Sequence, residues 1–168
     1  MLVGLISDTH GRVHGDVHRH FAGVEAILHA GDVGGEDVLE ELRLITPHVH
    51  AVAGNVDCGE ADLPLKRVVE LPLGKVGLSH GHLDPSDQGA RVRSLCATFA
   101  PNGVRLILHG HSHQQFLEFR KSTWIINPGA ACPPRFSTVA TVCLLHWDME
   151  TDLLSFHFKP LNWKQTLR

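Results

Sequence analysis

Short apolar runs alternate with helix-like segments up to about residue 113 of the chain. Runs of this length, bounded by glycine or polar residues, indicate buried strands at residues 2–6, 26–30, 48–53, 75–78 and 104–108. Between them, helices are expected over residues 14–23, from about Glu36 to the stop at Pro47, and from about Ser86 to Phe99. This alternation predicts a sheet with helices packed against its face.

The remainder of the chain has few helical signals. Further strands are expected at 116–119, 123–126, 138–147 and 153–158, and a strand at 67–71 forms a hairpin with that at 75–78. The late strands could complete a second sheet packed on the first. No linker, repeat or low-complexity segment divides the chain, so we expect one α/β domain of mixed α+β character over residues 1–168.

Side chains of metal-binding type stand where the predicted strands end. They are Asp8 with His10, Asp32, Asn55, His80, and His111 with His113. In open α/β sheets ligands bind outside the carboxyl ends of the strands, so these side chains are expected to converge on one edge. Nitrogen and oxygen donors without a thiolate suit Mn, Fe, Zn, Ni or Co. Two divalent ions would exceed the charge of the two aspartates by +2, which one hydroxide and one phosphodiester anion would balance.

Composition and charge exclude several other classes of protein. The chain has 168 residues, is 43% hydrophobic and 20% charged, and carries a formal net charge of -3 without a lysine or arginine run. An extended nucleic-acid surface is therefore disfavoured. The opening apolar run is too short for a signal peptide and nothing is long enough to span a bilayer, so a cytoplasmic location is expected. The cysteines have no C-x-x-C spacing, which disfavours a zinc ribbon or a thioredoxin-type site.

The five polar blocks, in this order and spacing, resemble the motifs of the calcineurin-like metallophosphoesterases. The short chain, His80-Gly-His82 and Asn127-Pro-Gly129 resemble the small YfcE-type phosphodiesterase branch of that family. The resemblance implies a four-layer αββα sandwich of two mixed sheets flanked by helices, with a dinuclear metal site. Manganese is the first expectation for both ions, and Asp32 is expected to bridge them. One ion would be held by Asp8, His10, Asp32 and His113, and the other by Asp32, Asn55, His80 and His111.

The implied activity is hydrolysis of a phosphodiester by a hydroxide that bridges the two ions, on a small or nucleotide-like substrate. Asp32 and Asn55 would take part in catalysis, and Asn55 with Arg135 would contact the substrate. One departure matters: Val56 stands where many members of the family carry a histidine that steadies the transition state or protonates the leaving group. We therefore expect slow turnover and a preference for acidic leaving groups, and His82 could replace the missing acid.

Other interpretations stay open at this point. The chain could be a nuclease of the same superfamily, or a weakly active or inactive scaffold like the related retromer subunit, and it could form a homo-oligomer. His82 is as well explained as a buried, hydrogen-bonded histidine, and Arg135 as a surface arginine. Within the strands, His29 and His109 are expected to be structural. Asp57 is expected to cap the loop that follows it, with a supporting hydrogen bond at the metal site as the alternative.

Overall fold

The strands of the computed structural model lie close to the apolar runs that predict them. The structure describes residues 1–57, 62–134 and 139–163. The helices in this part of the chain are α1 (Gly15–His20), α2 (Glu36–Arg43), α3 (Gln88–Phe99) and a 3-10 turn η1 (Ala100–Asn102). The strands are β1 (Leu2–Ile6), β2 (Ala26–His29), β3 (Val49–Ala51), β4 (Lys66–Leu71), β5 (Gly74–Ser79), β6 (Leu106–Leu108), β7 (Gln115–Arg120), β8 (Thr123–Pro128), β9 (Thr141–Asp148) and β10 (Leu153–Pro160).

The strands form two mixed sheets of five strands each. The first has the order β10-β9-β1-β2-β3, and the second has the order β4-β5-β6-β8-β7. In the first sheet β1, β2 and β3 are parallel, while β9 runs antiparallel to β1 and β10 antiparallel to β9. In the second sheet β5, β6 and β8 are parallel, and β4 and β7 close the two edges antiparallel.

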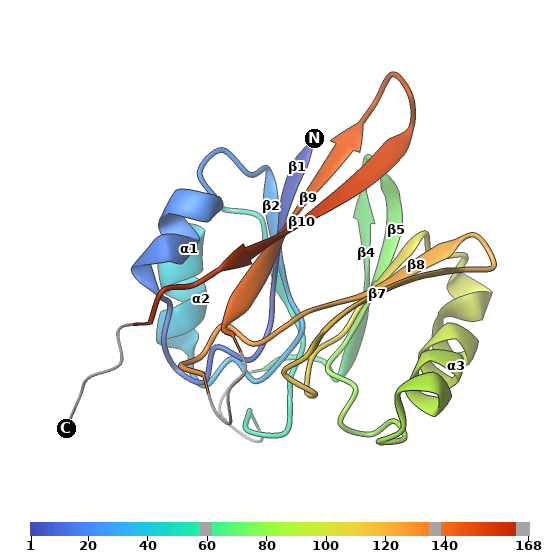
Figure 1. The fold of residues 1–168 in the computed structure, drawn as a ribbon, viewed down its shortest axis with the longest axis horizontal. Coiled ribbons are helices and arrows are strands. Elements are labelled where there is room, and N and C mark those ends of the chain that lie inside the picture. Colours follow the sequence, from blue (N-terminus) through green and yellow to red (C-terminus); the bar gives the residue numbers. More distant parts are fainter. Residues whose placement is uncertain (58–61, 135–138, 164–168) are drawn as a thin grey trace.

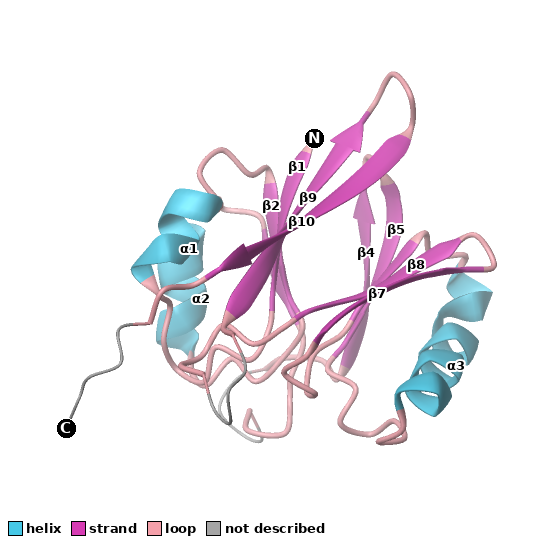
Figure 2. Ribbon diagram, viewed as in Figure 1, coloured by secondary structure: helices cyan, strands magenta, loops and turns pink. Residues whose placement is uncertain are grey.

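Three hydrophobic cores make this a four-layer αββα sandwich, which confirms the predicted fold class (Figure 2). The central core lies between the sheets and joins residues such as Leu5 and Leu28 of the first sheet to Leu106 and Ile126 of the second. A second core packs α1 and α2 on the outer face of the first sheet. The third packs α3 on the outer face of the second sheet.

The last two strands depart from the expected arrangement. Rather than completing the second sheet, β9 and β10 return to the first, where β9 pairs with β1. The reason lies in the burial of β9 on both faces: Cys143 and Leu145 enter the core between the sheets, and Val142 enters the core beneath α1 and α2. A strand with two buried faces needs a position covered on both sides, which the place beside β1 supplies.

The parallel strands of both sheets run toward the same end of the sandwich. In Figure 1 the loops that follow β1, β2, β5, β6 and β8 gather at its lower end, between the two sheets. The loops after β1, β2, β5 and β6 carry four of the polar blocks of the sequence, and the fifth block, with Asn55, follows β3. No helix in the described ranges combines the length and the apolar character needed to cross a membrane.

Candidate metal centre

The loops at this end hold several polar residues in a left-handed backbone conformation. Among the described non-glycine residues eight have a positive φ, and five of them are Asp8, His10, Asp32, His111 and His113, with φ between 49° and 69°. This conformation is unfavourable for residues with a Cβ atom, and such strain clusters at functional sites. The sharp turns direct these side chains across the ends of the strands. The same backbone conformation therefore both carries the strain and brings the side chains together.

Two glycines allow these loops to approach one another closely. A Cβ atom on Gly54 would lie 2.2 Å from both the backbone nitrogen and the Oδ1 atom of Asp32. A Cβ atom on Gly110 would lie 1.9 Å from Ser7 Oγ, in the loop after β1. Only glycine fits at either contact, and both contacts bring residues from different strands to the same place.

The first group of donors joins the loops after β1 and β6, with Asp32 beside them. His10 Nε2 and His113 Nε2 are 3.4 Å apart, and His113 Nε2 lies 3.2 Å from Asp8 Oδ1. His10 Nε2 also lies 3.7 Å from Asp32 Oδ2. Asp8, His10 and His113 each offer one atom within a single 4.8 Å cluster that could hold a metal ion.

The second group surrounds His80, at the end of β5. His80 Nε2 lies 3.2 Å from Asn55 Oδ1 and 3.3 Å from Asp32 Oδ1. The same amide oxygen of Asn55 is 3.1 Å from His111 Nδ1. Asp8, Asp32 and His80 make up a second cluster of metal-binding type, so the two aspartates stand between the two groups.

Three features of these groups fit bound cations. Asp8 Oδ1 is buried without a hydrogen-bond partner, although His113 Nε2 lies 3.2 Å away. The ring nitrogens of His10 and His113 face each other, which requires a proton or a cation between them. The carbonyl of Ala30 can only accept the 2.8 Å hydrogen bond from His80 Nδ1, so in neutral His80 the lone pair on Nε2 faces oxygen atoms. A histidine whose other nitrogen donates to a backbone carbonyl is typical of metal ligands.

The electrostatics of the protein atoms point the same way. Burial opposes ionisation of Asp32, but its contact with His80 and the N–H of Val56 lower its pKa to about 2. Burial likewise opposes protonation of His80, yet Asp32 and Asp8 outweigh it and raise the pKa of His80. The lowered pKa of Asp32 and the raised pKa of His80 both indicate that a positive charge is stabilised beside these carboxyl groups. Divalent ions would supply that charge.

The remaining predicted residues lie around this cluster or outside the described ranges. The His82 ring centroid is 5.4 Å from that of His80 and 6.3 Å from that of His111, and burial followed by the charge of His80 lowers the pKa of His82. Val56 is 42% exposed beside Asn55, so an apolar side chain stands at the rim. Arg135, the predicted substrate contact, lies outside the described residues.

Asp57 has the supporting role that the sequence analysis gave as the alternative to a cap. Its buried carboxylate accepts the backbone N–H groups of Val33 (3.1 Å), Gly34 (2.8 Å) and Gly54 (2.7 Å). It therefore ties the loop that carries Asp32 to the loop that carries Asn55, while the segment that it was expected to cap begins at residues 58–61, outside the described residues. The signal available in the sequence was only its place two residues after Asn55, which does not identify the N–H donors on another loop.

Asn127 performs a similar task for the loop after β6. Its amide nitrogen donates to Gly110 O at 2.8 Å and to Ser112 Oγ at 3.1 Å, and its Oδ1 accepts the N–H of Gly129 at 2.9 Å. The bonds to Gly110 and Ser112 hold the backbone of the turn that carries His111 and His113.

His29, the last residue of β2, and His109, directly after β6, are buried and structural, as the sequence predicts. Burial lowers the pKa of both His29 and His109 to about 4, so both are neutral near pH 7. His29 Nδ1 accepts the N–H of Gly31 at 3.2 Å, and its Nε2 lies 2.9 Å from the hydroxyl of Thr9. The described hydrogen bonds of these two rings do not reach any of the proposed metal ligands, so neither histidine is placed among them.

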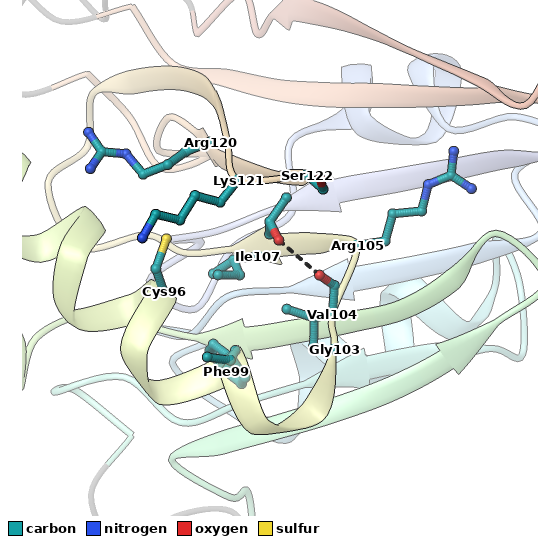
Figure 3. A pocket seen from close by; sticks show the side chains of 11 residues that line it. Cys96, Phe99, Gly103, Val104, Arg105, Ile107, Arg120, Lys121 and Ser122 are labelled. Atoms are coloured by element: carbon teal, nitrogen blue, oxygen red, sulfur yellow. Dashed lines mark hydrogen bonds between the residues drawn. The ribbon is translucent and has the colours of Figure 1, made fainter.

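A separate cavity of about 490 Å³ lies at the opposite end of β6 (Figure 3). It is formed by α3, the segment that leads into β6 and the turn between β7 and β8, and Thr123 Oγ1 donates to Val104 O across it at 3.1 Å. Its described lining includes neither a carboxylate nor an imidazole. Two of its cations, Arg105 and Arg120, are already paired with acidic side chains.

Comparison with known proteins agrees with this geometry. A sequence model described as the calcineurin-like phosphoesterase superfamily domain matches residues 1–150. A probable metallophosphoesterase of Methanothermobacter thermautotrophicus is 34% identical over 150 residues, which cover 86% of this chain and 85% of that protein. Phosphodiesterase MJ0936 of Methanocaldococcus jannaschii is 24% identical over 79% of this chain and 85% of its own length. Vps29 of Entamoeba histolytica, solved as a zinc complex, shares the fold with a TM-score of 0.73 at 23% identity, over 96% of this chain and 100% of that one.

Proposed function

Because the chain belongs to the calcineurin-like phosphoesterase superfamily, we propose that it is a metal-dependent hydrolase of phosphodiester bonds. Two divalent ions would lie at the end of the sandwich where the parallel strands stop, with Asp32 shared between them. The proposed ligands are Asp8, His10, Asp32 and His113 for one ion and Asp32, Asn55, His80 and His111 for the other.

The observation that carries the proposal is the meeting of these donors from separate loops around two buried carboxyl groups. Asp8 and Asp32 are 0% and 2% exposed, so water solvates these carboxyl groups poorly. Buried charges are normally paired or coordinate metals. Two divalent ions would leave an excess of +2 over the two aspartates, which favours an anionic substrate such as a phosphodiester.

When bound, two such ions would activate a water molecule as the nucleophile and neutralise charge on the phosphoryl oxygens. The chain itself supplies the alignment of the ligands, because Asp57 and Asn127 hold the backbone of the loops that carry them. We assign the protonation of the leaving oxygen to His82, whose ring lies on the His80 and His111 side of the centre.

Val56 shapes the expected substrate range. A valine side chain cannot donate a proton, and this one is 42% exposed next to Asn55. Turnover is therefore expected to be slow, with aryl phosphodiesters preferred over alkyl ones because aryl leaving groups need less protonation. Equal rates on alkyl and aryl esters of the same type would contradict this part of the proposal.

Metal analysis combined with hydrolysis of bis(p-nitrophenyl) phosphate in the presence of Mn²⁺ tests the proposal. We expect two ions per chain and measurable hydrolysis, and Asp32→Ala should lower the rate by at least about a hundredfold. Asp152→Asn is the matched control, because Asp152 pairs with Arg105 beside the β9–β10 turn. Metal bound without hydrolysis would favour the scaffold interpretation, and activity unaffected by Asp32→Ala would refute the two-metal site.

A further inference from the structure

A hollow of about 510 Å³ adjoins the metal centre on the side of His113. Its lining begins with His113 and continues through Gln114 to Gln115, the first residue of β7. The rest of the wall comes from the start of β9, the residue two before it and the end of β10; these residues are Val139, Thr141, Phe158 and Pro160. Because His113 is one of the proposed metal ligands, a group bound in this hollow would lie beside the ions.

The sheet topology explains why a hollow forms at this place. β7 and β10 are edge strands of the two sheets. The rings of Trp124, on β8, and Phe156, on β10, have centroids 5.1 Å apart, so these two edges lie on the same side of the sandwich. β7 runs antiparallel to β8, and β10 runs antiparallel to β9, which is itself antiparallel to β1. The start of β7 and the end of β10 therefore lie at the end of the sandwich where the parallel strands stop, next to the metal centre.

The side chains of this hollow suit an uncharged, flat group. Its described lining contains no carboxylate, lysine or arginine. The Thr141 hydroxyl donates to Pro128 O at 2.7 Å, so its proton is already used within the fold. The half-buried Phe158 offers an aromatic ring, and the exposed amides of Gln114 and Gln115 can both donate and accept hydrogen bonds. A neutral ring system with hydrogen-bonding edges would use all of these groups.

We propose that this hollow binds the nucleobase of a nucleotide phosphodiester, with Phe158 stacking on the base and the Gln115 amide contacting its edge. This inference rests on the proposed phosphodiesterase function and names the substrate class of that site. Every base has a face that can stack on an aromatic side chain. A glutamine amide can pair with both N6 and N7 of adenine, so adenosine is the probe that uses both contacts.

The position of Gln115 favours it over its neighbour for this contact. Gln115 is paired with Pro128 in the ladder between β7 and β8, whereas Gln114 precedes the strand. A side chain on a paired strand residue loses less freedom on binding. The volume of the hollow also lies within the range of roughly 300–1,000 Å³ that is usual for small-molecule sites.

An alkyl chain is the competing occupant, because Val139, Phe158 and Pro160 are apolar. Such a chain would gain from the apolar side chains but would make no use of the two amides. The amides at the wall therefore favour a base, and a matched alkyl ester distinguishes the two occupants.

The first measurement detects the base without catalysis. In the protein supplemented with zinc, adenosine should shift the Gln115 side-chain amide signals in ¹H–¹⁵N correlation spectra, with a Kd of about 1 mM or tighter. Gln115→Ala assigns these signals, and Phe158→Leu, which keeps an apolar side chain, should raise the Kd by about threefold or more. Leu117→Ala is the matched control, because Leu117 is an exposed residue of β7 outside the lining of the hollow.

The second measurement compares three p-nitrophenyl phosphodiesters that share one leaving group and differ in the other ester arm: adenosine 5′, methyl and octyl. We expect kcat/KM for the adenosine ester to exceed that for the methyl ester by about tenfold or more, chiefly through a lower KM. Phe158→Leu and Gln115→Ala should each reduce this ratio by about threefold or more, whereas Leu117→Ala should preserve it.

The outcomes separate the two levels of inference. If the wild type hydrolyses none of the esters, the proposed function fails, and the spectra still test the hollow. If adenosine at roughly 10 mM leaves the Gln115 signals unchanged, the nucleobase proposal is refuted. It is refuted equally if the octyl ester is preferred as strongly as the adenosine ester, or if Phe158→Leu slows all three esters by the same factor.

Discussion

The hydrogen bonds of Asp57 offer the most direct test of how the metal centre is supported. Three backbone N–H groups from two loops end on one carboxylate that is 4% exposed. Asp57→Ala removes all three acceptors at once. Because each buried donor left unpaired costs about 1–3 kcal/mol, the simple sum is roughly 3–9 kcal/mol.

The lower half of that range is the better expectation. Gly34 is exposed, so water can replace the carboxylate at that donor, whereas Val33 and Gly54 are buried. We expect Asp57→Ala to lose about 3–5 kcal/mol, and Asp57→Asn about 1–2 kcal/mol because one oxygen can still accept from Val33 and Gly54. Such losses are a large share of the roughly 5–15 kcal/mol by which domains are stable.

Urea unfolding of the metal-free protein in chelator, followed by circular dichroism, measures these values. Glu40→Gln, at an exposed position of α2, is the control and should stay within about 0.5 kcal/mol of the wild type. A second readout is metal affinity, which Asp57→Asn should weaken by about tenfold or more because both ligand-bearing loops loosen. Wild-type stability in Asp57→Ala would refute the idea that this carboxylate ties the loops together.

Three further outcomes follow from the same structure. Gly54→Ala should abolish binding of the ion assigned to Asp32, Asn55, His80 and His111, as measured by calorimetry, because the new Cβ would lie 2.2 Å from Asp32 Oδ1. Gly15→Ala, where the added Cβ has open space around it, should bind metal normally. Burial lowers the pKa of His109 to about 4, below its unfolded value near 6.5, so the unfolded chain takes up the proton first and stability falls as the pH drops from 6.5 to 4. The urea midpoint of His109→Gln should therefore fall less over that range than the wild-type midpoint, and parallel curves would contradict the buried neutral ring. Val56→His would add a second proton donor beside His82 and should raise the rate on alkyl phosphodiesters by up to about a hundredfold with little gain on aryl ones. A uniform change on both would argue against protonation of the leaving oxygen as the step that limits alkyl esters.

Much of the architecture could be predicted from the chain alone because its signals are local. Apolar runs of strand length and helical spacing between them depend only on neighbouring residues, and the observed strands lie close to these runs. The placement of metal-binding residues directly after strands predicted one shared edge, since parallel strands end on the same side. The return of β9 and β10 to the first sheet was not predictable, because several positions in two sheets can bury the same apolar pattern.

The sequence by itself determined which donors stand at the strand ends, how many there are, and the order in which they come. Only the tertiary structure decided which atoms meet: Asp8 with His113, Asn55 with both His80 and His111, and Asp57 with a loop more than twenty residues before it. The chemical type of a residue is fixed by its own side chain. Its contact partner is fixed only when folding brings residues that are far apart in the sequence together. The left-handed turns that aim these side chains are stable only because packing around them outweighs their strain, and that packing exists only in the folded molecule.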